Sequence, residues 1–137
     1  MSYPRRLHLV ELPDTLAVCR ISLDSELEMW FLSEPFFVML RSDDTLTIVC
    51  SQEKVPQEVQ QERGWRALKI EGRFDFSETG ILESVLKPLA EAGLGIFAVS
   101  SFETDYVLVK EGALDAVREA LKRAGHTISR LEESPTG

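Results

Sequence analysis

A polar loop that leads into an expected helix carries groups suited to binding the carboxylate of a small ligand. Residues 66–72 alternate as a strand does, and an apolar helical stripe begins just beyond Gly80. The backbone N–H groups of Gly80 and Ile81 would lie at the positive end of a helix dipole, where a carboxylate binds favourably. Glycine at this point also leaves room for the ligand to approach closely. The sequence thus predicts an anion-binding position at the start of this helix.

A second polar segment supplies the complementary chemistry. Residues 100–105 form a polar turn between two apolar runs. Glu103 and Asp105 of this turn, together with Asp75 of the loop, would accept charge-assisted hydrogen bonds from a ligand ammonium group. The turn also offers two hydroxyl groups to orient the ligand and one aromatic ring to line its aliphatic part: Ser101, Thr104 and Phe102. The surplus of carboxylates favours a ligand with a second positive charge, such as arginine or lysine.

Each of these residues also has a purely structural explanation. Asp75, Ser77 or Thr79 would serve as a cap of the helix. Residues 103–105 would form an ordinary acidic hairpin turn, and Phe102 would belong to the core. Taken one at a time, the structural explanations are the stronger. Only the combination of both segments on one fold favours a ligand site.

The second half of the chain predicts one complete α+β module. Its elements follow the order strand, helix, strand, strand, helix, strand over residues 66–72, 80–92, 95–101, 105–110, 113–124 and 126–128. Two crossover units of this kind give an antiparallel four-stranded sheet with both helices on one face, the ferredoxin-like arrangement. We predict that the loop before Gly80 and the turn at residues 100–105 converge to hold opposite ends of the ligand.

The first half repeats this order in a degenerate form. Residues 37–49 can be laid without gaps on residues 97–109, because both have an apolar run, a polar acidic turn and another apolar run. The other elements predicted for this copy, an extra edge strand, a strand and two short helices, fall at residues 7–12, 16–22, 25–32 and 56–63. The self-similarity predicts two tandem modules, at residues 1–65 and 66–130, with a flexible tail at 131–137. The alternative is a chance resemblance between two hairpins.

Composition narrows the class of function. The formal net charge of −8 makes nucleic acid and anionic membranes poor partners, since both require clustered Lys and Arg. No apolar stretch approaches the roughly 20 residues of a membrane helix. Cys19 and Cys50 sit in apolar runs, as small buried hydrophobes do in a reducing compartment. We therefore expect a cytoplasmic protein.

The sequence also lacks the groups that catalysis and cofactors require. His8 and His126 are far apart and have no Cys or carboxylate at metal-ligand spacing. No nucleophile motif and no phosphate-binding glycine fingerprint occurs. An acidic pair, Asp75 and Asp105, could carry general acid–base chemistry, which is the basis of an enzyme alternative. We expect a non-enzymatic protein with no metal and no cofactor.

At the level of whole motifs, the chain resembles ACT domains, the βαββαβ regulatory modules that bind amino acids. Residues 75–82, which lead from a strand into a helix, resemble their ligand loop. Residues 96–109 are the more specific match, because they are similar to the tandem-ACT family of small bacterial proteins related to the cytosolic arginine sensors of animals. Residues 37–50 and 64–68 also fit that family, and the resemblance extends over about residues 12–130.

The resemblance implies an amino acid bound between ACT modules, near the first loop of one module and the hairpin of another. The implied ligand-binding positions of the loop are Gly72, Asp75, Thr79 and Gly80. Those of the turn are Ser101, Phe102, Thr104 and Asp105. The animal sensors have four modules and this chain has two, so a homodimer is implied.

The leading hypothesis is an amino-acid sensor in which the ligand shifts the population of module arrangements. The alternative is a structural or protein-interaction module that dimerises through its ACT sheets without a ligand.

Overall fold

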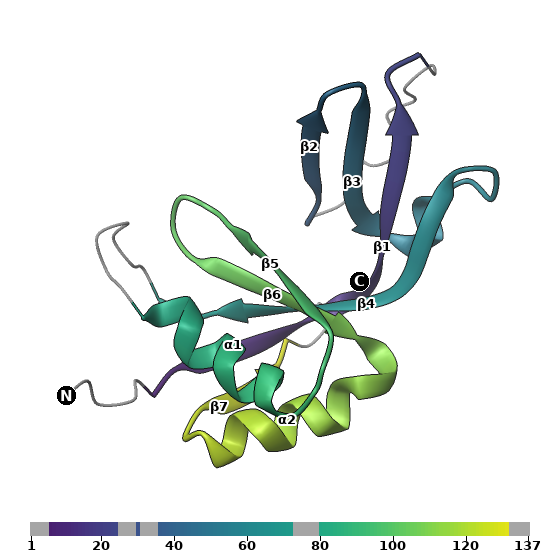
Figure 1. Cartoon of the computed structure of the whole chain (residues 1–137). Coiled ribbons are helices and arrows are strands. Elements are labelled where there is room, and N and C mark those ends of the chain that lie inside the picture. Colours follow the sequence, from purple (N-terminus) through teal and green to yellow (C-terminus); the bar gives the residue numbers. More distant parts are fainter. Residues whose placement is uncertain (1–5, 25–29, 31–35, 73–79, 132–137) are drawn as a thin grey trace, which may run out of the picture. The chain divides into compact units, whose positions relative to one another are not determined.

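The computed structural model describes residues 6–24, 30, 36–72 and 80–131 (Figure 1). The strands are β1 (His8–Ser22), β2 (Val38–Ser42), β3 (Thr45–Ser51), β4 (Gln60–Ile70), β5 (Ile96–Ser100), β6 (Asp105–Lys110) and β7 (Thr127–Arg130). The α-helices are α1 (Ile81–Glu91) and α2 (Leu114–Arg123), and the 3-10 helices are η1 (Gln52–Lys54) and η2 (Glu111–Ala113).

The chain divides into two compact units. Residues 1–13 and 66–137 form the outer unit, and residues 14–65 form the inserted unit. Strands β1 and β4 each contribute residues to both units. The predicted boundary at residue 65 therefore coincides with one end of the inserted unit, but the segment before residue 14 groups with the second half of the chain.

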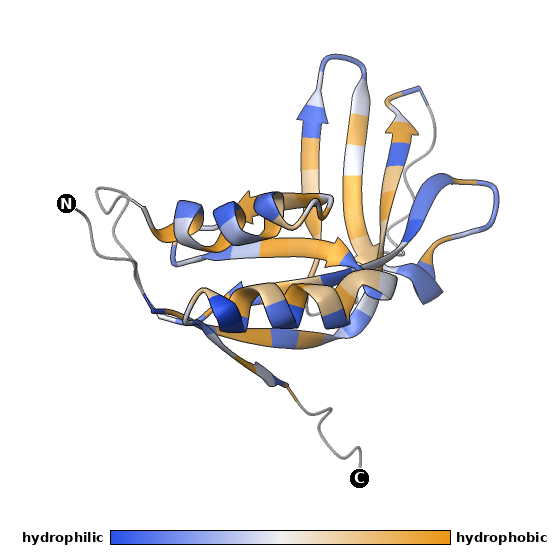
Figure 2. Cartoon of the chain, turned by 60° about the horizontal axis from the view of Figure 1, so that its bottom comes forward, coloured by the Kyte–Doolittle hydropathy of each residue, from blue (hydrophilic) through white to orange (hydrophobic). Residues whose placement is uncertain are grey.

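In the outer unit, one sheet carries both helices on the same face. The strand order is β7-β1-β4-β6-β5, with β1 and β4 contributing their outer-unit residues. Polar and apolar residues interleave along both helices (Figure 2). Their apolar stripes pack against alternate residues of the strands in a single core. The strands contribute Leu9, Leu68, Ile70, Val107 and Val109, and the helices contribute Val85, Leu89, Val117 and Leu121. The elements predicted for the second half are present in the predicted order, so the mixed α and β prediction is confirmed here.

A glycine lies just beyond the end of each helix. Gly93 follows α1 with φ 74°, and its N–H donates to the Ala90 carbonyl while the N–H of Leu94 donates to the Leu89 carbonyl. Gly125 follows α2 with φ 95° and the same pair of backbone bonds. These left-handed glycines satisfy carbonyls that a helix end leaves unpaired, and they turn the chain back toward the sheet.

The predicted edge strand at residues 7–12 is wrong in its placement. This segment is the first part of β1, and it lies inside the outer sheet between β7 and β4. β7 pairs with it in parallel from His8↔Thr127 to Glu11↔Arg130. Because Leu9 and Glu11 are buried here, the backbone between them needs hydrogen-bond partners on both sides. The outer sheet therefore holds one strand more than the predicted four.

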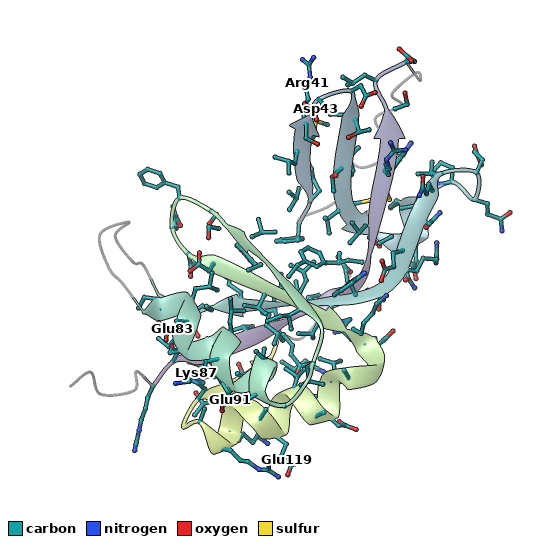
Figure 3. All side chains as sticks on the ribbon, in the orientation of Figure 1. Arg41, Asp43, Glu83, Lys87, Glu91 and Glu119 are labelled. Carbon is teal, nitrogen blue, oxygen red and sulfur yellow. The ribbon has the colours of Figure 1, made fainter. Side chains whose placement is uncertain are left out.

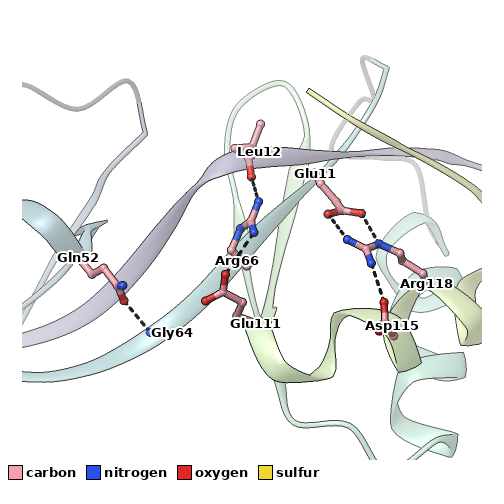
Figure 4. A network of polar contacts seen from close by, with 8 residues as sticks. All are labelled: Glu11, Leu12, Gln52, Gly64, Arg66, Glu111, Asp115 and Arg118. Atoms are coloured by element: carbon pink, nitrogen blue, oxygen red, sulfur yellow. Dashed lines mark hydrogen bonds and ion pairs between the residues drawn. The ribbon is translucent and has the colours of Figure 1, made fainter. Parts of the chain in front are cut away.

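Two buried polar side chains fix α2 and β4 against β1 (Figure 4). Arg118 of α2 donates from Nε and Nη2 to the two carboxylate oxygens of Glu11, at 2.7 and 2.9 Å. Glu11 is only 3% exposed. The hydrogen bonds from Arg118 lower the pKa of Glu11, and those same bonds raise the pKa of Arg118. Arg66 of β4 donates from Nη2 to the Leu12 carbonyl at 2.9 Å.

The inserted unit is built on the antiparallel strand order β2-β3-β1-β4. β1 pairs with β3 from Leu16↔Ser51 to Ser22↔Thr45, and β2 pairs with β3 from Val38↔Val49 to Ser42↔Thr45. Its core is apolar and includes both cysteines, which are free thiols: Ala17, Cys19, Ile21, Leu46, Ile48, Cys50 and Val55. The predicted hairpin at residues 37–49 and the predicted burial of the cysteines are confirmed.

The helix predicted at residues 56–63 is wrong. Residues 56–59 form a turn closed by the Val59 N–H on the Pro56 carbonyl, and β4 begins at Gln60. The amide of Gln61 donates to the carbonyls of Pro56 and Val59, which holds that turn in place of a helix. Pairing of β4 with β1 outweighs the weak helical preference of these charged residues.

The other helix predicted for the first half, at residues 25–32, lies outside the described residues apart from Trp30. The two tandem modules therefore stay a prediction, as does the flexible tail at 131–137.

Candidate functional site

The outer unit contains a partly open hollow of about 370 Å³ where the end of β4 meets the turn between β5 and β6. Its volume is within the range that accommodates small metabolites. The hollow is lined by Lys69, Glu71, Gly72, Ser101, Glu103, Thr104 and Tyr106. Four of these, Gly72, Ser101, Glu103 and Thr104, are residues that the sequence predicts for a ligand site. Loop and turn residues predicted from separate parts of the chain thus share one hollow.

Strand alternation explains which face of the sheet carries the hollow. Leu68 and Ile70 of β4 are buried among the helices, so Lys69 between them lies on the opposite face. The same alternation on β6 puts Val107 in the helix-side core and Tyr106 on the other face. β4 and β6 are neighbours in the sheet. The hollow therefore lies on the sheet face that α1 and α2 leave uncovered.

The turn at one side of the hollow is shaped by its own hydroxyl groups. The Ser101 Oγ donates to the Thr104 carbonyl at 2.8 Å and accepts from the Thr104 N–H at 3.2 Å. The Ser101 N–H also donates to the Thr104 carbonyl at 2.8 Å. Thr104, 5% exposed, donates from Oγ1 to the Ile70 carbonyl at 2.5 Å. These bonds fasten the turn to the end of β4, so both hydroxyls hold the wall of the hollow in place.

The charged lining of the hollow is one lysine and two glutamates. Lys69 and Glu71 come from the end of β4, and Glu103 comes from the turn. Glu71 lies 3.7 Å from Nε2 of His8, with its side chain 62% exposed. A hollow that presents both an ammonium and carboxylates can hold the two ends of a zwitterion.

Sequence reasoning missed three lining residues: Lys69, Glu71 and Tyr106. A signal for Lys69 was available, because it alternates with apolar Leu68 and Ile70 in the predicted strand that leads to Gly72. A signal for Tyr106 was also available, because it directly follows the predicted Asp105 in the predicted strand at residues 105–110. A prediction that included the polar residues on the open face of each strand would have contained both.

Four other predicted residues are described but do not line this hollow. Gly80 precedes α1 with φ 81°, and Ile81 is part of the outer-unit core. Phe102 is 82% exposed, which rules out the core explanation for its ring. Asp105 begins β6 opposite Ser100. The predicted positions Asp75 and Thr79 lie outside the described residues.

Both histidines have structural partners. His126 is buried, and its Nδ1 accepts from the Leu7 N–H at 3.0 Å, which leaves Nε2 to donate to the Ser84 carbonyl at 2.8 Å. His8 bonds the hydroxyls of Thr127 and Ser129 at 2.5 and 2.8 Å. Within the described part of the chain, no group of three or more His, Cys, Asp or Glu side chains could hold a metal ion.

Among the described residues, none of the helices has the length and apolar character needed to cross a membrane.

Two family models match the chain. The model of an ACT domain matches residues 60–123. A second model, of an N-terminal domain, matches residues 14–58. The division between them falls close to the end of the inserted unit at residue 65.

Solved structures resemble the chain over most of its length. A crystal structure of a protein from Agobacterium tumefaciens is 34% identical, with a TM-score of 0.88 over 97% of this chain and 99% of that one. The aspartate kinase of Clostridium acetobutylicum is 15% identical, with a TM-score of 0.61 over 82% of this chain and 33% of that one. At that identity the second match shows a shared fold alone.

Curated relatives match a shorter part of the chain. Subunit 1 of the cytosolic arginine sensor for mTORC1 from Homo sapiens is 37% identical over 60 residues, which is 43% of this chain and 18% of that protein. The rat protein of the same name is 29% identical over 99 residues, 66% of this chain and 30% of the relative. The chain thus spans less than a third of the length of these relatives.

Proposed function

We propose that the chain, which belongs to the ACT-domain family and is related to the cytosolic arginine sensors of animals, is an amino-acid-binding regulatory protein. The ligand is held in the hollow between the end of β4 and the β5–β6 turn. The protein works in the cytoplasm and has no catalytic role. Binding favours one arrangement of the ACT modules over others, because a ligand shifts the population toward the state that it binds better.

The observation that carries this proposal is the meeting of Gly72 with Ser101 and Thr104 around one hollow. The two segments are far apart in the sequence, and the resemblance to ACT domains implied both as ligand-binding. The turn is held rigidly by the bonds from Ser101 and Thr104, so the hollow exists before a ligand arrives. A preformed site loses less free energy to ordering when the ligand binds.

The remaining predicted residues do not line the hollow, and we propose that they contact the ligand from outside it. The N–H groups of Gly80 and Ile81, with Asp75, Thr79, Phe102 and Asp105, would complete the site when a second copy of the chain is present. This is the reason to propose a homodimer: the resemblance places the amino acid between modules, and each chain carries one loop and one hairpin of the required kind.

The charge of the lining favours a cationic amino acid. Glu71 and Glu103 outnumber Lys69, so the hollow is electronegative even after a ligand carboxylate is neutralised. An arginine or lysine side chain would supply the further positive charge. The relatives named as arginine sensors make arginine the first ligand to test.

A thermal-shift screen of the full chain against the twenty amino acids tests the proposed function, followed by isothermal titration of each amino acid that stabilises the protein. A ligand at 100 times its dissociation constant adds about 2.7 kcal/mol to the free energy of unfolding, which is a measurable shift in Tm. We expect arginine or lysine to give the largest shift. Tighter binding of a neutral or acidic amino acid would refute the cationic preference, and no shift with any of the twenty would refute the function.

One observation favours a second candidate, a structural module that dimerises without a ligand. β2 is an edge strand of the inserted unit, and its apolar residues Met39 and Leu40 are 44% and 58% exposed. An exposed apolar edge strand can pair with another strand. Light scattering with and without arginine separates the two candidates. The sensor predicts a ligand-dependent change in assembly or stability, and the structural module predicts the same dimer in both conditions.

A further inference from the structure

We propose that Lys69 selects ligands that carry a carboxylate, by binding that carboxylate on the sheet face opposite the helices. The inference rests on the proposed function, since it concerns the same hollow. It assigns the carboxylate to a strand residue that sequence reasoning did not include. The start of α1, which the sequence predicted for this task, then becomes a secondary contact.

The first step concerns the hydroxyl groups of the hollow. A hydroxyl has one hydrogen to donate. That of Ser101 goes to the Thr104 carbonyl, and that of Thr104 goes to the Ile70 carbonyl. Neither hydroxyl can donate to a ligand carboxylate without breaking the turn that forms the hollow. The donors for a carboxylate must come from elsewhere in the lining.

The second step concerns the cations of the outer unit. Arg118 is bonded to Glu11, and Arg66 is bonded to the Leu12 carbonyl and lies 3.6 Å from Glu111. Lys69 is the cationic residue of the hollow's lining. Its ammonium has three donors, and its flexible stem lets them reach a bound ligand.

The third step concerns the surroundings of Lys69. The strand positions on either side, Leu68 and Ile70, are fully buried, which fixes the Cα of Lys69 and the direction of its side chain. Glu71 and Glu103 lie in the same lining and would hold the cationic end of the ligand. One ammonium facing two carboxylates recognises a molecule with a carboxylate at one end and positive charge at the other.

The fourth step compares Lys69 with the start of α1. Gly80 and Ile81 do not line the hollow, and the Ile81 side chain is part of the core. A carboxylate held at the helix start would leave Lys69 without influence on selectivity. A carboxylate held in the hollow would make the preference for ligands with a carboxylate depend on Lys69. The two positions therefore predict different results for a change at Lys69.

The test is isothermal titration of the full chain with L-arginine and with agmatine, which is arginine without its carboxylate. For any other amino acid that binds in the screen, the same comparison uses its own decarboxylated amine. We expect the wild-type protein to bind arginine at least about tenfold more tightly than agmatine, as a charge-assisted contact predicts. Lys69→Met should weaken arginine binding while leaving agmatine binding nearly unchanged, so that the ratio falls to about two or less.

Two variants control for charge and for folding. Lys87→Met removes the same charge from the exposed face of α1, beside Glu83 and Glu91, and should leave the ratio at its wild-type value (Figure 3). Lys69→Arg keeps a cation at the site and should retain most of the preference for arginine. Thermal unfolding without ligand checks that each variant is folded.

The outcomes separate the inference from the function on which it rests. If arginine binds but the ratio is near one in the wild type, or is unchanged in Lys69→Met, the role of Lys69 is overturned and the function stands. If the ratio falls equally in Lys87→Met, the effect is one of net charge and the role is again overturned. If none of the twenty amino acids binds the wild type, the function and the inference fail together.

Discussion

The outer and the inserted unit contain hairpins with the same sequence pattern and different surroundings. The β2–β3 turn is exposed, with Asp43 at φ 49° and the Thr45 hydroxyl donating to the Ser42 carbonyl at 3.1 Å. The β5–β6 turn is fastened to β4 by the buried hydroxyl of Thr104. Only the fastened turn borders the hollow. Alternation of apolar and polar residues therefore predicts a hairpin, while a buried contact from its turn decides whether it can form part of a site.

The units also differ in what they bury. Of the buried polar residues, Glu11, Arg66, Thr104 and His126 belong to the outer unit, and Ser51 belongs to the inserted unit. Paired polar groups in a core fix geometry more strictly than apolar contacts do, because misplacement leaves a buried donor or acceptor without a partner. The unit that carries the candidate site is the unit with this constraint.

The largest expected effect comes from the buried ion pair of the outer unit. Glu11→Ala leaves Arg118, whose side chain is 27% exposed, with Asp115 as its remaining partner, and should lower the free energy of unfolding by about 3 kcal/mol. Glu119→Ala removes an exposed partner of Arg123 on the same helix and should cost no more than about 0.5 kcal/mol. Urea unfolding of both variants provides the measurement. Equal costs would show that the buried pair adds no constraint.

Matched changes in the two turns come next. Thr104→Val leaves the buried Ile70 carbonyl without its donor and should cost about 1–3 kcal/mol, with loss of ligand binding. Thr45→Val in the exposed turn should stay within about 0.5 kcal/mol. Thermal unfolding and titration with arginine measure both effects. A Thr104 variant that is as stable as the wild type would remove the distinction between the hairpins.

Acid should lower the free energy of unfolding of the outer unit by protonating Glu11 of the same ion pair. The expected loss is smaller than that in Glu11→Ala. Hydrogen bonds from Arg118 lower the pKa of Glu11 below its ordinary value of 4.5. A lowered folded-state pKa gives stability that is present above 4.5 and is lost as the pH falls through the folded value. Stability measured from pH 6 to pH 3 should therefore fall more steeply in the wild type than in Glu11→Gln. Parallel curves would contradict this origin.

The smallest effect on stability is expected at the exposed edge of the inserted unit. Leu40→Lys on β2 should change the free energy of unfolding by no more than about 0.5 kcal/mol, because the side chain is already exposed. A charge on an edge strand opposes pairing with another strand. If β2 forms a dimer contact, light scattering should show dissociation in this variant. An unchanged assembly would exclude β2 as the contact.

Local patterns were sufficient to predict much of the outer unit. The apolar stripe of α1, the glycines after both helices and the β5–β6 hairpin each depend on residues close together in the sequence. The errors arose where distant segments decide. Pairing with β1 turned residues 60–63 into strand, and β7 made residues 8–11 an interior strand. Lys69 was missed because its proposed role depends on the residues that line the hollow with it. The sequence of a single strand does not show which residues those are.

The parallel pairing of β7 with β1 has a consequence for biosynthesis. Next to this strand pair, the Leu7 N–H donates a hydrogen bond to the ring of His126, a residue 119 positions later in the sequence. The segment around His8 leaves the ribosome early, yet its parallel neighbour emerges only when residues 127–130 have been translated. Until then this flank of the nascent sheet has open backbone groups, which makes it a place where a chaperone can attach.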